Sequence, residues 1–109
     1  MDTVNELTLT DANFETATSK GVVLVNFWAP WCGPCLRQAP FIEKVAATMS
    51  GLVKVGKCDI DKELGTPARF DIKGIPTLVI LKNGKEVERF TGVQRDDLLI
   101  ATLKKHLEP

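Results

Sequence analysis

The chain has 109 residues, of which 44% are hydrophobic and 26% charged, an ordinary balance for one globular domain. Its 14 basic residues match 14 acidic ones, which disfavours a nucleic-acid-binding protein because such proteins usually carry a basic excess. Three cysteines cannot all pair within one chain, which excludes a disulfide-rich scaffold and favours a reducing compartment such as the cytoplasm.

The patterns along the chain predict alternating strands and helices. Thr10 or Asp11 can cap the first helix. Residues 22–28 are almost continuously apolar, which is typical of a strand buried on both faces. Asn83 and Gly84 indicate a two-residue hairpin, because both central residues of such a turn need a positive φ. In chain order we predict a strand over 3–10, a helix over 11–19, a strand over 22–28, a helix over 34–49, a strand over 52–60, a short irregular helix over 61–70, strands over 77–81 and 86–91, and a helix over 95–106.

This alternation predicts one α/β domain over residues 1–109, with a parallel portion in its sheet and an antiparallel edge at the hairpin. The longest apolar run, residues 22–29, is too short to span a bilayer, so no membrane insertion is expected. The first residues, Met1–Glu6, lack the basic start and apolar stretch of a signal peptide. These features agree with a cytoplasmic location.

Cys32 and Cys35 lie three residues apart at the start of the predicted helix 34–49. The first helical N–H groups have no intrahelical partner, so they and the helix dipole favour a negative charge on Cys32. Because the thiolate is the reactive form of cysteine, we expect Cys32 to be the nucleophile. Cys35 lies one turn deeper and can attack the mixed disulfide formed at Cys32, which releases a reduced target. Gly33 leaves space for a partner's backbone, and Pro34 stiffens the turn.

Two other uses of this cysteine pair are disfavoured. A zinc site needs further ligands, but only Cys58 and His106 remain, and neither stands at metal-ligand spacing. A purely structural disulfide across so short a loop restrains little of the unfolded chain. We therefore expect no metal and no bound cofactor, and a redox-active disulfide between Cys32 and Cys35.

Several segments carry a resemblance to a known family. They are residues 27–35 with Trp31-Cys32-Gly33-Pro34-Cys35, then Pro40, residues 59–61, 74–77 and 82–84, and Gly92. Their order and spacing resemble those of the thioredoxin family over essentially the whole chain. The resemblance implies a thioredoxin fold, with a central mixed five-stranded sheet flanked by four helices, and a protein-disulfide reductase. It implies disulfide-containing target proteins and a thioredoxin reductase that uses NADPH and flavin, although a ferredoxin-linked donor stays open.

The resemblance also implies a docking surface for an extended substrate segment. Pro76 would be in cis and pack against the two cysteines, although an ordinary trans proline at a strand start also fits the local pattern. Ile75 would offer backbone hydrogen bonds to the substrate. The implied docking surface consists of Trp31, Gly33, Pro34, Ile75, Pro76, Gly92 and Val93, any one of which could alone be a core or turn residue.

Position 26 departs from the family pattern, because most close relatives carry a buried Asp where this chain has Asn26. Asn cannot ionise, so it cannot act as the general base that this Asp is thought to provide for the deeper cysteine. Lys57 matches the family's partly buried lysine and here would face a neutral amide. We expect Asn26 to keep the position polar and hypothesise that Lys57 or a water handles the proton of Cys35. A lysine that extends to solvent is the alternative.

The remaining expectations concern Cys58, the choice of function and the oligomeric state. Cys58 is predicted to be a small core residue, with an oxidisable regulatory thiol as the alternative. An oxidase or isomerase of the same fold usually has a histidine between its cysteines, and Gly33 and Pro34 supply none. A redox-inactive docking subunit would have no need of both Cys32 and Cys35. We expect a monomer, because no extended apolar stripe is predicted beyond the docking surface.

Overall fold

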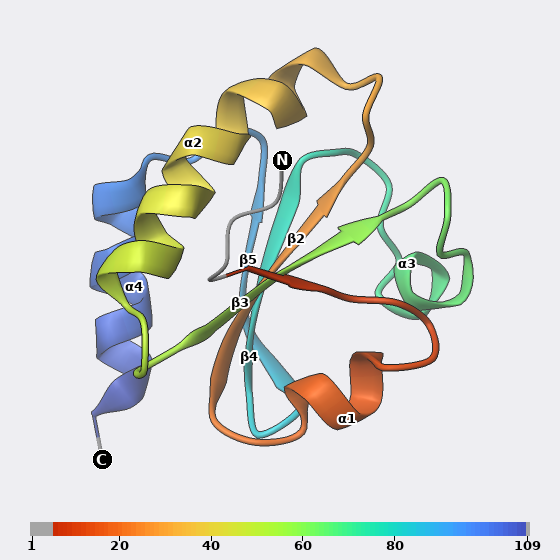
Figure 1. Ribbon diagram of the computed structural model, residues 1–109. Helices are drawn as coiled ribbons and strands as arrows, with labels where there is room; N and C mark the ends of the chain where they lie inside the picture. The colour runs from red at the N-terminus through yellow and green to blue at the C-terminus, as the bar shows by residue number, and fades with distance from the viewer. Residues whose placement is uncertain (1–5, 109) are drawn as a thin grey trace.

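The computed structural model describes residues 6–108, which form one sheet with helices on both faces (Figure 1). The strand order is β1-β3-β2-β4-β5. β1 and β2 run parallel to β3, whereas β4 is antiparallel to both β2 and β5. The elements are β1 (Glu6–Thr8), α1 (Phe14–Thr18), β2 (Val22–Trp28), α2 (Gly33–Thr48), β3 (Lys54–Asp59), α3 (Gly65–Arg69), β4 (Thr77–Lys82), β5 (Lys85–Thr91) and α4 (Asp96–Leu107). Within residues 6–108, no helix is long and apolar enough to cross a membrane.

The predicted fold class is confirmed, and the predicted elements are present with shifted ends. β1 covers only Glu6–Thr8 of the strand predicted over 3–10, and residues 3–5 of that prediction lie outside the described part of the chain. β3 begins at Lys54, because Leu52 and Val53 still bond back to the end of α2 at Met49. The helix predicted over 61–70 is reduced to Gly65–Arg69.

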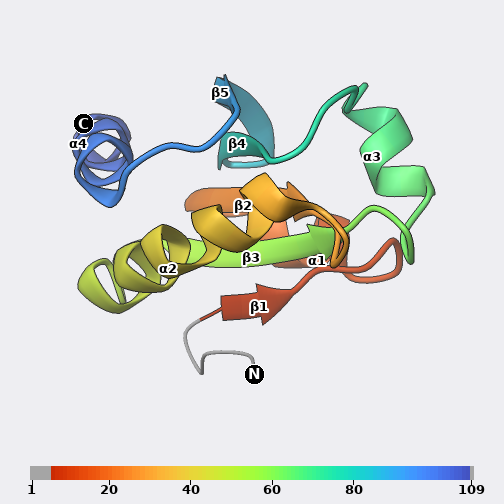
Figure 2. The same cartoon turned by 90° about the horizontal axis from the view of Figure 1, so that it is seen from above.

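Side chains alternate across β2, so two separate cores form on the two faces of the sheet. Figures 1 and 2 show α2 and α4 on one face and α3 on the other, where α1 also packs. Val22 and Leu24 pack against α2 and α4, whereas Val23, Val25 and Phe27 belong to the core under α1 and α3. The prediction of a strand buried on both faces is therefore confirmed. The same alternation places residue 26 on the α2 face.

β4 belongs to the antiparallel part of the sheet. The predicted parallel portion and the predicted antiparallel edge at the hairpin are both present, and β4 also runs antiparallel to its central neighbour β2. The chain therefore re-enters the sheet from the end at which β3 leaves it.

The hairpin between β4 and β5 forms as predicted. Asn83 and Gly84 have φ values of 52° and 84°, both in the left-handed region. The side chain of Asn83 also accepts a hydrogen bond from the N–H of Gly21 at 2.9 Å, and its own N–H donates to the Gly21 carbonyl. This turn therefore also fixes the connection that leads into β2.

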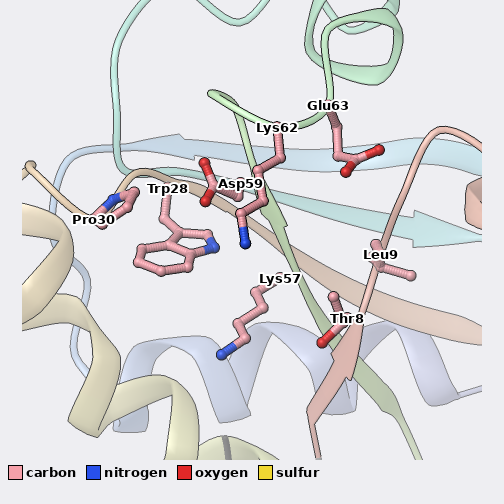
Figure 3. A pocket seen from close by; sticks show the side chains of 8 residues that line it. All are labelled: Thr8, Leu9, Trp28, Pro30, Lys57, Asp59, Lys62 and Glu63. Carbon is pink, nitrogen blue, oxygen red and sulfur yellow. The ribbon is translucent and has the colours of Figure 1, made fainter. Parts of the chain in front are cut away.

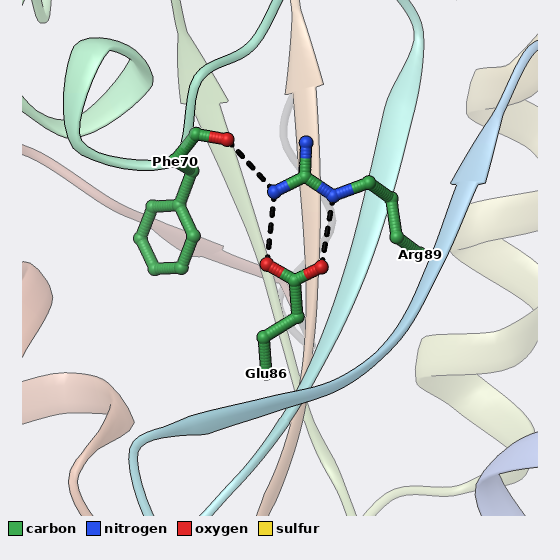
Figure 4. Close-up of polar contacts among 3 residues, drawn as sticks. All are labelled: Phe70, Glu86 and Arg89. Atoms are coloured by element: carbon green, nitrogen blue, oxygen red, sulfur yellow. Dashed lines mark hydrogen bonds and ion pairs between the residues drawn. The ribbon is translucent and has the colours of Figure 1, made fainter.

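Arg89 ties β5 to the end of α3 (Figure 4). Its guanidinium donates to both carboxylate oxygens of Glu86 at 2.8 Å, and Nη2 also donates to the carbonyl of Phe70 at 2.7 Å. The hydrogen bonds from Arg89 lower the pKa of the Glu86 carboxyl below its usual value. Phe70 in turn packs its ring against Phe14 and Phe27, so this contact links the edge strand to the core under α1 and α3.

Of the two residues predicted as a cap of the first helix, Thr10 accepts a hydrogen bond from the N–H of Asn13 at 3.1 Å, whereas Asp11 caps α3 instead. Its carboxylate accepts hydrogen bonds from the N–H groups of Gly65 and Thr66 at 3.0 and 2.7 Å, and from the Thr66 hydroxyl at 2.7 Å. The first helix begins only at Phe14 and has no side-chain cap. The Thr66 hydroxyl, followed by the two backbone donors, lowers the pKa of the Asp11 carboxyl below 3.8.

We expect Asp11→Asn to lower the melting temperature by a few degrees at neutral pH, because an amide cannot accept all three hydrogen bonds. A lowered folded-state pKa means that the stabilisation is complete above the ordinary value of 3.8 and is lost as the pH falls through the folded value. The melting temperatures of the two proteins should therefore converge as the pH falls below about 4. Thermal melts from pH 2 to pH 7 test this, with Glu108→Gln as the control for the change in charge. A difference in melting temperature that stays the same at every pH would contradict the prediction.

Candidate active site

Cys32 lies at the N-cap of α2, directly after the turn that follows β2. Cys32 and Cys35 form a disulfide, and the N–H of Cys35 donates to the Cys32 sulfur at 3.2 Å. Pro34 occupies the first turn of the helix, where the N–H that it lacks would have no intrahelical partner. The helix therefore directs a backbone donor and its positive end at Cys32, which stabilises a thiolate there once the disulfide is reduced.

The two cysteines differ only slightly in exposure. Cys32 is 5% exposed and Cys35 is 2% exposed, so Cys35 is slightly more buried than Cys32, as predicted. Both pack with Ala29 in a small apolar cluster, against which Ile60 and Ile75 also lie.

The peptide bond between Ile75 and Pro76 is cis, as the family resemblance implied. The Ile75 carbonyl oxygen lies 3.8 Å from the Cys32 sulfur. Pro76 itself is buried, and its carbonyl accepts a hydrogen bond from the N–H of Gly92 at 2.9 Å. Gly92 has a φ of 93°, a conformation that favours glycine. These contacts bring Ile75, Pro76 and Gly92 to the edge of the cysteine pair.

The remaining residues of the implied docking surface differ in how much they expose. Trp31 is 68% exposed, and its indole N–H donates to the carboxylate of Asp61 at 2.7 Å, which holds the ring in place. Gly33 and Pro34 are exposed, whereas Val93 is half-buried. The bond to Asp61 was not predicted, because the two residues lie 30 positions apart and only the fold brings them together.

A cavity of about 120 Å³ lies beneath Cys35 on the α2 face of the sheet. Asn26 and Lys57 are register partners on β2 and β3, and both line this cavity together with Cys35. Asn26 is 5% exposed, and its Oδ1 atom has no hydrogen-bond partner among the described residues. The Lys57 ammonium lies 5.5 Å from the centre of the Trp28 ring. The other lining residues are Glu6, Trp28, Leu36, Ala39 and Glu43.

A second cavity, of about 280 Å³, shares Trp28 and Lys57 with the first and is drawn in Figure 3. Its lining carries charges of both signs, from Lys57, Lys62, Asp59 and Glu63. The buried indole nitrogen of Trp28 has no partner among the described residues. Neither active-site cysteine lines this cavity, so it takes no direct part in thiol chemistry.

Cys58 belongs to the other side of the sheet, in the core under α1 and α3. It is fully buried, as predicted, and carries a free thiol. Burial, followed by the nearby negative charges of Glu63, Asp11 and Asp59, raises the pKa of the Cys58 thiol to about 12. Almost none of it is thiolate at neutral pH, which argues against the alternative of a regulatory thiol.

Comparison with known proteins agrees with this geometry. The family model described as Thioredoxin matches residues 5–105. Curated proteins named Thioredoxin from Staphylococcus aureus strains Mu50, MW2 and N315 are 41% identical to this chain over 99 residues, which cover 91% of this chain and 95% of each relative.

Proposed function

The chain belongs to the thioredoxin family, and from that premise we propose a reaction in which Cys32 and Cys35 act one after the other on a target disulfide. The protein is a protein-disulfide reductase, a thiol–disulfide oxidoreductase whose working group is the redox-active Cys32–Cys35 disulfide. One observation carries the proposed order: Cys32 is the helix N-cap, and its sulfur accepts the Cys35 N–H at 3.2 Å.

In the first exchange, the Cys32 thiolate attacks one sulfur of the target disulfide. The target's S–S bond breaks, a mixed disulfide forms at Cys32, and the other target sulfur leaves as a thiolate that takes a proton from water. In the second exchange, Cys35 loses its proton and attacks the Cys32 sulfur, which closes the Cys32–Cys35 disulfide and releases the second target thiolate. Two electrons thereby pass from the dithiol to the target. The slightly deeper position of Cys35, which is 2% exposed against 5% for Cys32, supports this order.

We propose that water in the 120 Å³ cavity accepts the proton of Cys35. A water molecule occupies about 30 Å³ in the liquid, so the cavity is large enough for a small cluster. The unpartnered Oδ1 of Asn26 offers such water a hydrogen-bond acceptor beside the sulfur. Lys57 lines the same cavity, and a nearby cation favours the thiolate of Cys35 over its thiol. Asn26 and Lys57 are thus supporting residues, and neither takes the proton itself.

Substrate binding is assigned to the docking surface, which consists of Trp31, Gly33, Pro34, Ile75, Pro76, Gly92 and Val93. The carbonyl of Ile75 lies 3.8 Å from the Cys32 sulfur, so an extended segment that pairs with this backbone brings its disulfide to Cys32. The space beside Gly33 is open, because an added Cβ there would meet no heavy atom within 4 Å. A substrate backbone can therefore approach closely at this point. The ring of Trp31 supplies exposed apolar area beside the pair.

The partners follow from this chemistry. We propose disulfide-containing proteins as electron acceptors and a thioredoxin reductase that uses NADPH and flavin as the donor, acting on residues 1–109 as a single monomeric domain. A reducing compartment, the cytoplasm, fits best, because the free thiol of Cys58 has no partner cysteine in this chain.

The reduction of insulin by dithiothreitol tests the function. We expect micromolar amounts of the protein to bring forward the turbidity caused by the precipitating insulin B chain, because the thiolate at Cys32 reacts faster than the free reagent. A docking subunit with incidental cysteines would leave the lag unchanged. Titration against glutathione then distinguishes a reductase from an oxidase, whose disulfide is reduced at a higher potential.

A further inference from the structure

Gln38 is a fully buried polar side chain on α2, three residues after Cys35. Burial of an amide is costly unless its hydrogen bonds are replaced. Here Nε2 donates to the carbonyl of Gln94 at 2.9 Å, and Oε1 accepts from the N–H of Gln94 at 2.7 Å. Both bonds go to the backbone of one residue that lies 56 positions further along the chain.

This pair of bonds anchors one end of a short segment of the docking surface. Gln94 directly follows Gly92 and Val93 in the connection between β5 and α4. The other end is anchored by the bond from the Gly92 N–H to the carbonyl of Pro76. Residues 92–94 thus connect the residues just before β4, among them Ile75 and Pro76, to α2, at whose start the two cysteines lie.

We propose that Gln38 is a positioning residue, which holds Gly92 and Val93 against the active-site helix and thereby sets the affinity for polypeptide substrates. The proposal rests on the docking surface described above. An extended protein segment must contact Ile75 and the 92–93 segment at the same time as its disulfide meets Cys32. A small aromatic disulfide has no such flanking segment. Gln38 therefore affects protein disulfides and leaves small disulfides unaffected.

Gln38→Met tests the proposal, because methionine has a similar length and removes both hydrogen bonds. We expect KM for insulin to rise about tenfold with kcat unchanged, since only binding is affected. The rate with 5,5′-dithiobis(2-nitrobenzoic acid) and the redox potential should stay the same. The Gln94 amide should also lose its protection from hydrogen exchange. The proposal is overturned if the reaction is impaired equally with insulin and with the small aromatic disulfide, or if it is impaired with neither.

Three companion variants separate the possible causes. Val45→Ala weakens the core of the same helix away from the 92–94 segment and should leave KM for insulin unchanged. Gln38→Leu also removes both hydrogen bonds with an uncharged side chain and should give the same rise in KM; it decides the question if Gln38→Met does not fold. Trp31→Ala tests the docking surface itself. If Trp31→Ala raises KM and the Gln38 variants do not, the inference about Gln38 fails alone; if none raises KM, the docking surface fails.

Discussion

Replacement of Cys35 by serine is expected to stop the reaction after the first exchange and to leave target proteins covalently attached to Cys32. Cys32 keeps its place at the N-cap of α2 in this variant, so its thiolate still attacks. A serine hydroxyl cannot displace a disulfide, so the mixed disulfide has no internal route to release. Cys32→Ser removes the nucleophile and should form no adduct. In either variant the rate of insulin reduction should fall by on the order of a thousandfold.

Non-reducing electrophoresis and intact mass spectrometry of each variant with a disulfide-containing protein measure these outcomes. Cys58→Ala is the matched control, because it removes the one thiol that lies in the core on the other face of the sheet. It should reduce insulin at nearly the wild-type rate. Adducts with Cys32→Ser, and none with Cys35→Ser, would reverse the proposed order of attack.

Asn26→Asp is expected to lower the free energy of unfolding by about 3 kcal/mol at pH 7, equivalent to a carboxyl pKa raised by about two units. Residue 26 is 5% exposed, so a carboxylate there loses most of its hydration. Lys57 lines the same cavity and offsets part of this cost, while Glu6 and Glu43 at its lining add to it. A single cation does not fully compensate for such a buried charge.

The pH dependence identifies the cause. A carboxyl whose pKa is raised by folding binds its proton more tightly in the folded state, so stability falls as the pH rises through the folded pKa. The variant should therefore match the wild type near pH 4 and fall progressively below it towards neutral pH. Urea titrations from pH 4 to pH 8 measure this. Asn83→Asp makes the same chemical change on the exposed hairpin and should show no such trend; a flat difference for Asn26→Asp would refute the burial argument.

The same variant should speed the second exchange near neutral pH. Asn26 and Cys35 line one cavity, so a carboxylate at position 26 can take the proton of Cys35 through a water. Single-turnover stopped-flow reduction of a protein disulfide resolves this step by the change in tryptophan fluorescence. Equal rates for both proteins would show that release of the proton does not limit the second exchange.

Features that depend on neighbouring residues could be predicted from the sequence. The continuous apolar run of β2 identified a strand buried on both faces, because a strand with one face in water must alternate. Asn83 and Gly84 identified the hairpin, since few other residue pairs adopt two positive φ values. The position of Cys32 at a helix start followed from Pro34 and the apolar pattern after it. The chemistry of the nucleophile was thus determined locally.

Features that join distant segments were decided only by the tertiary structure. Asp11 bonds to Gly65 and Thr66, although a capping pattern alone assigns it to the helix that follows. Gln38 appears in the sequence as an ordinary polar residue of an amphipathic helix, and only the approach of Gln94 accounts for its burial. A side chain shows its chemistry in the sequence, but its partner depends on how the sheet brings the elements together. The sequence by itself therefore predicted Cys32 as the attacking sulfur, because that prediction depends only on the start of one helix. The fold alone showed that Ile75 and residues 92–94 lie beside that helix start.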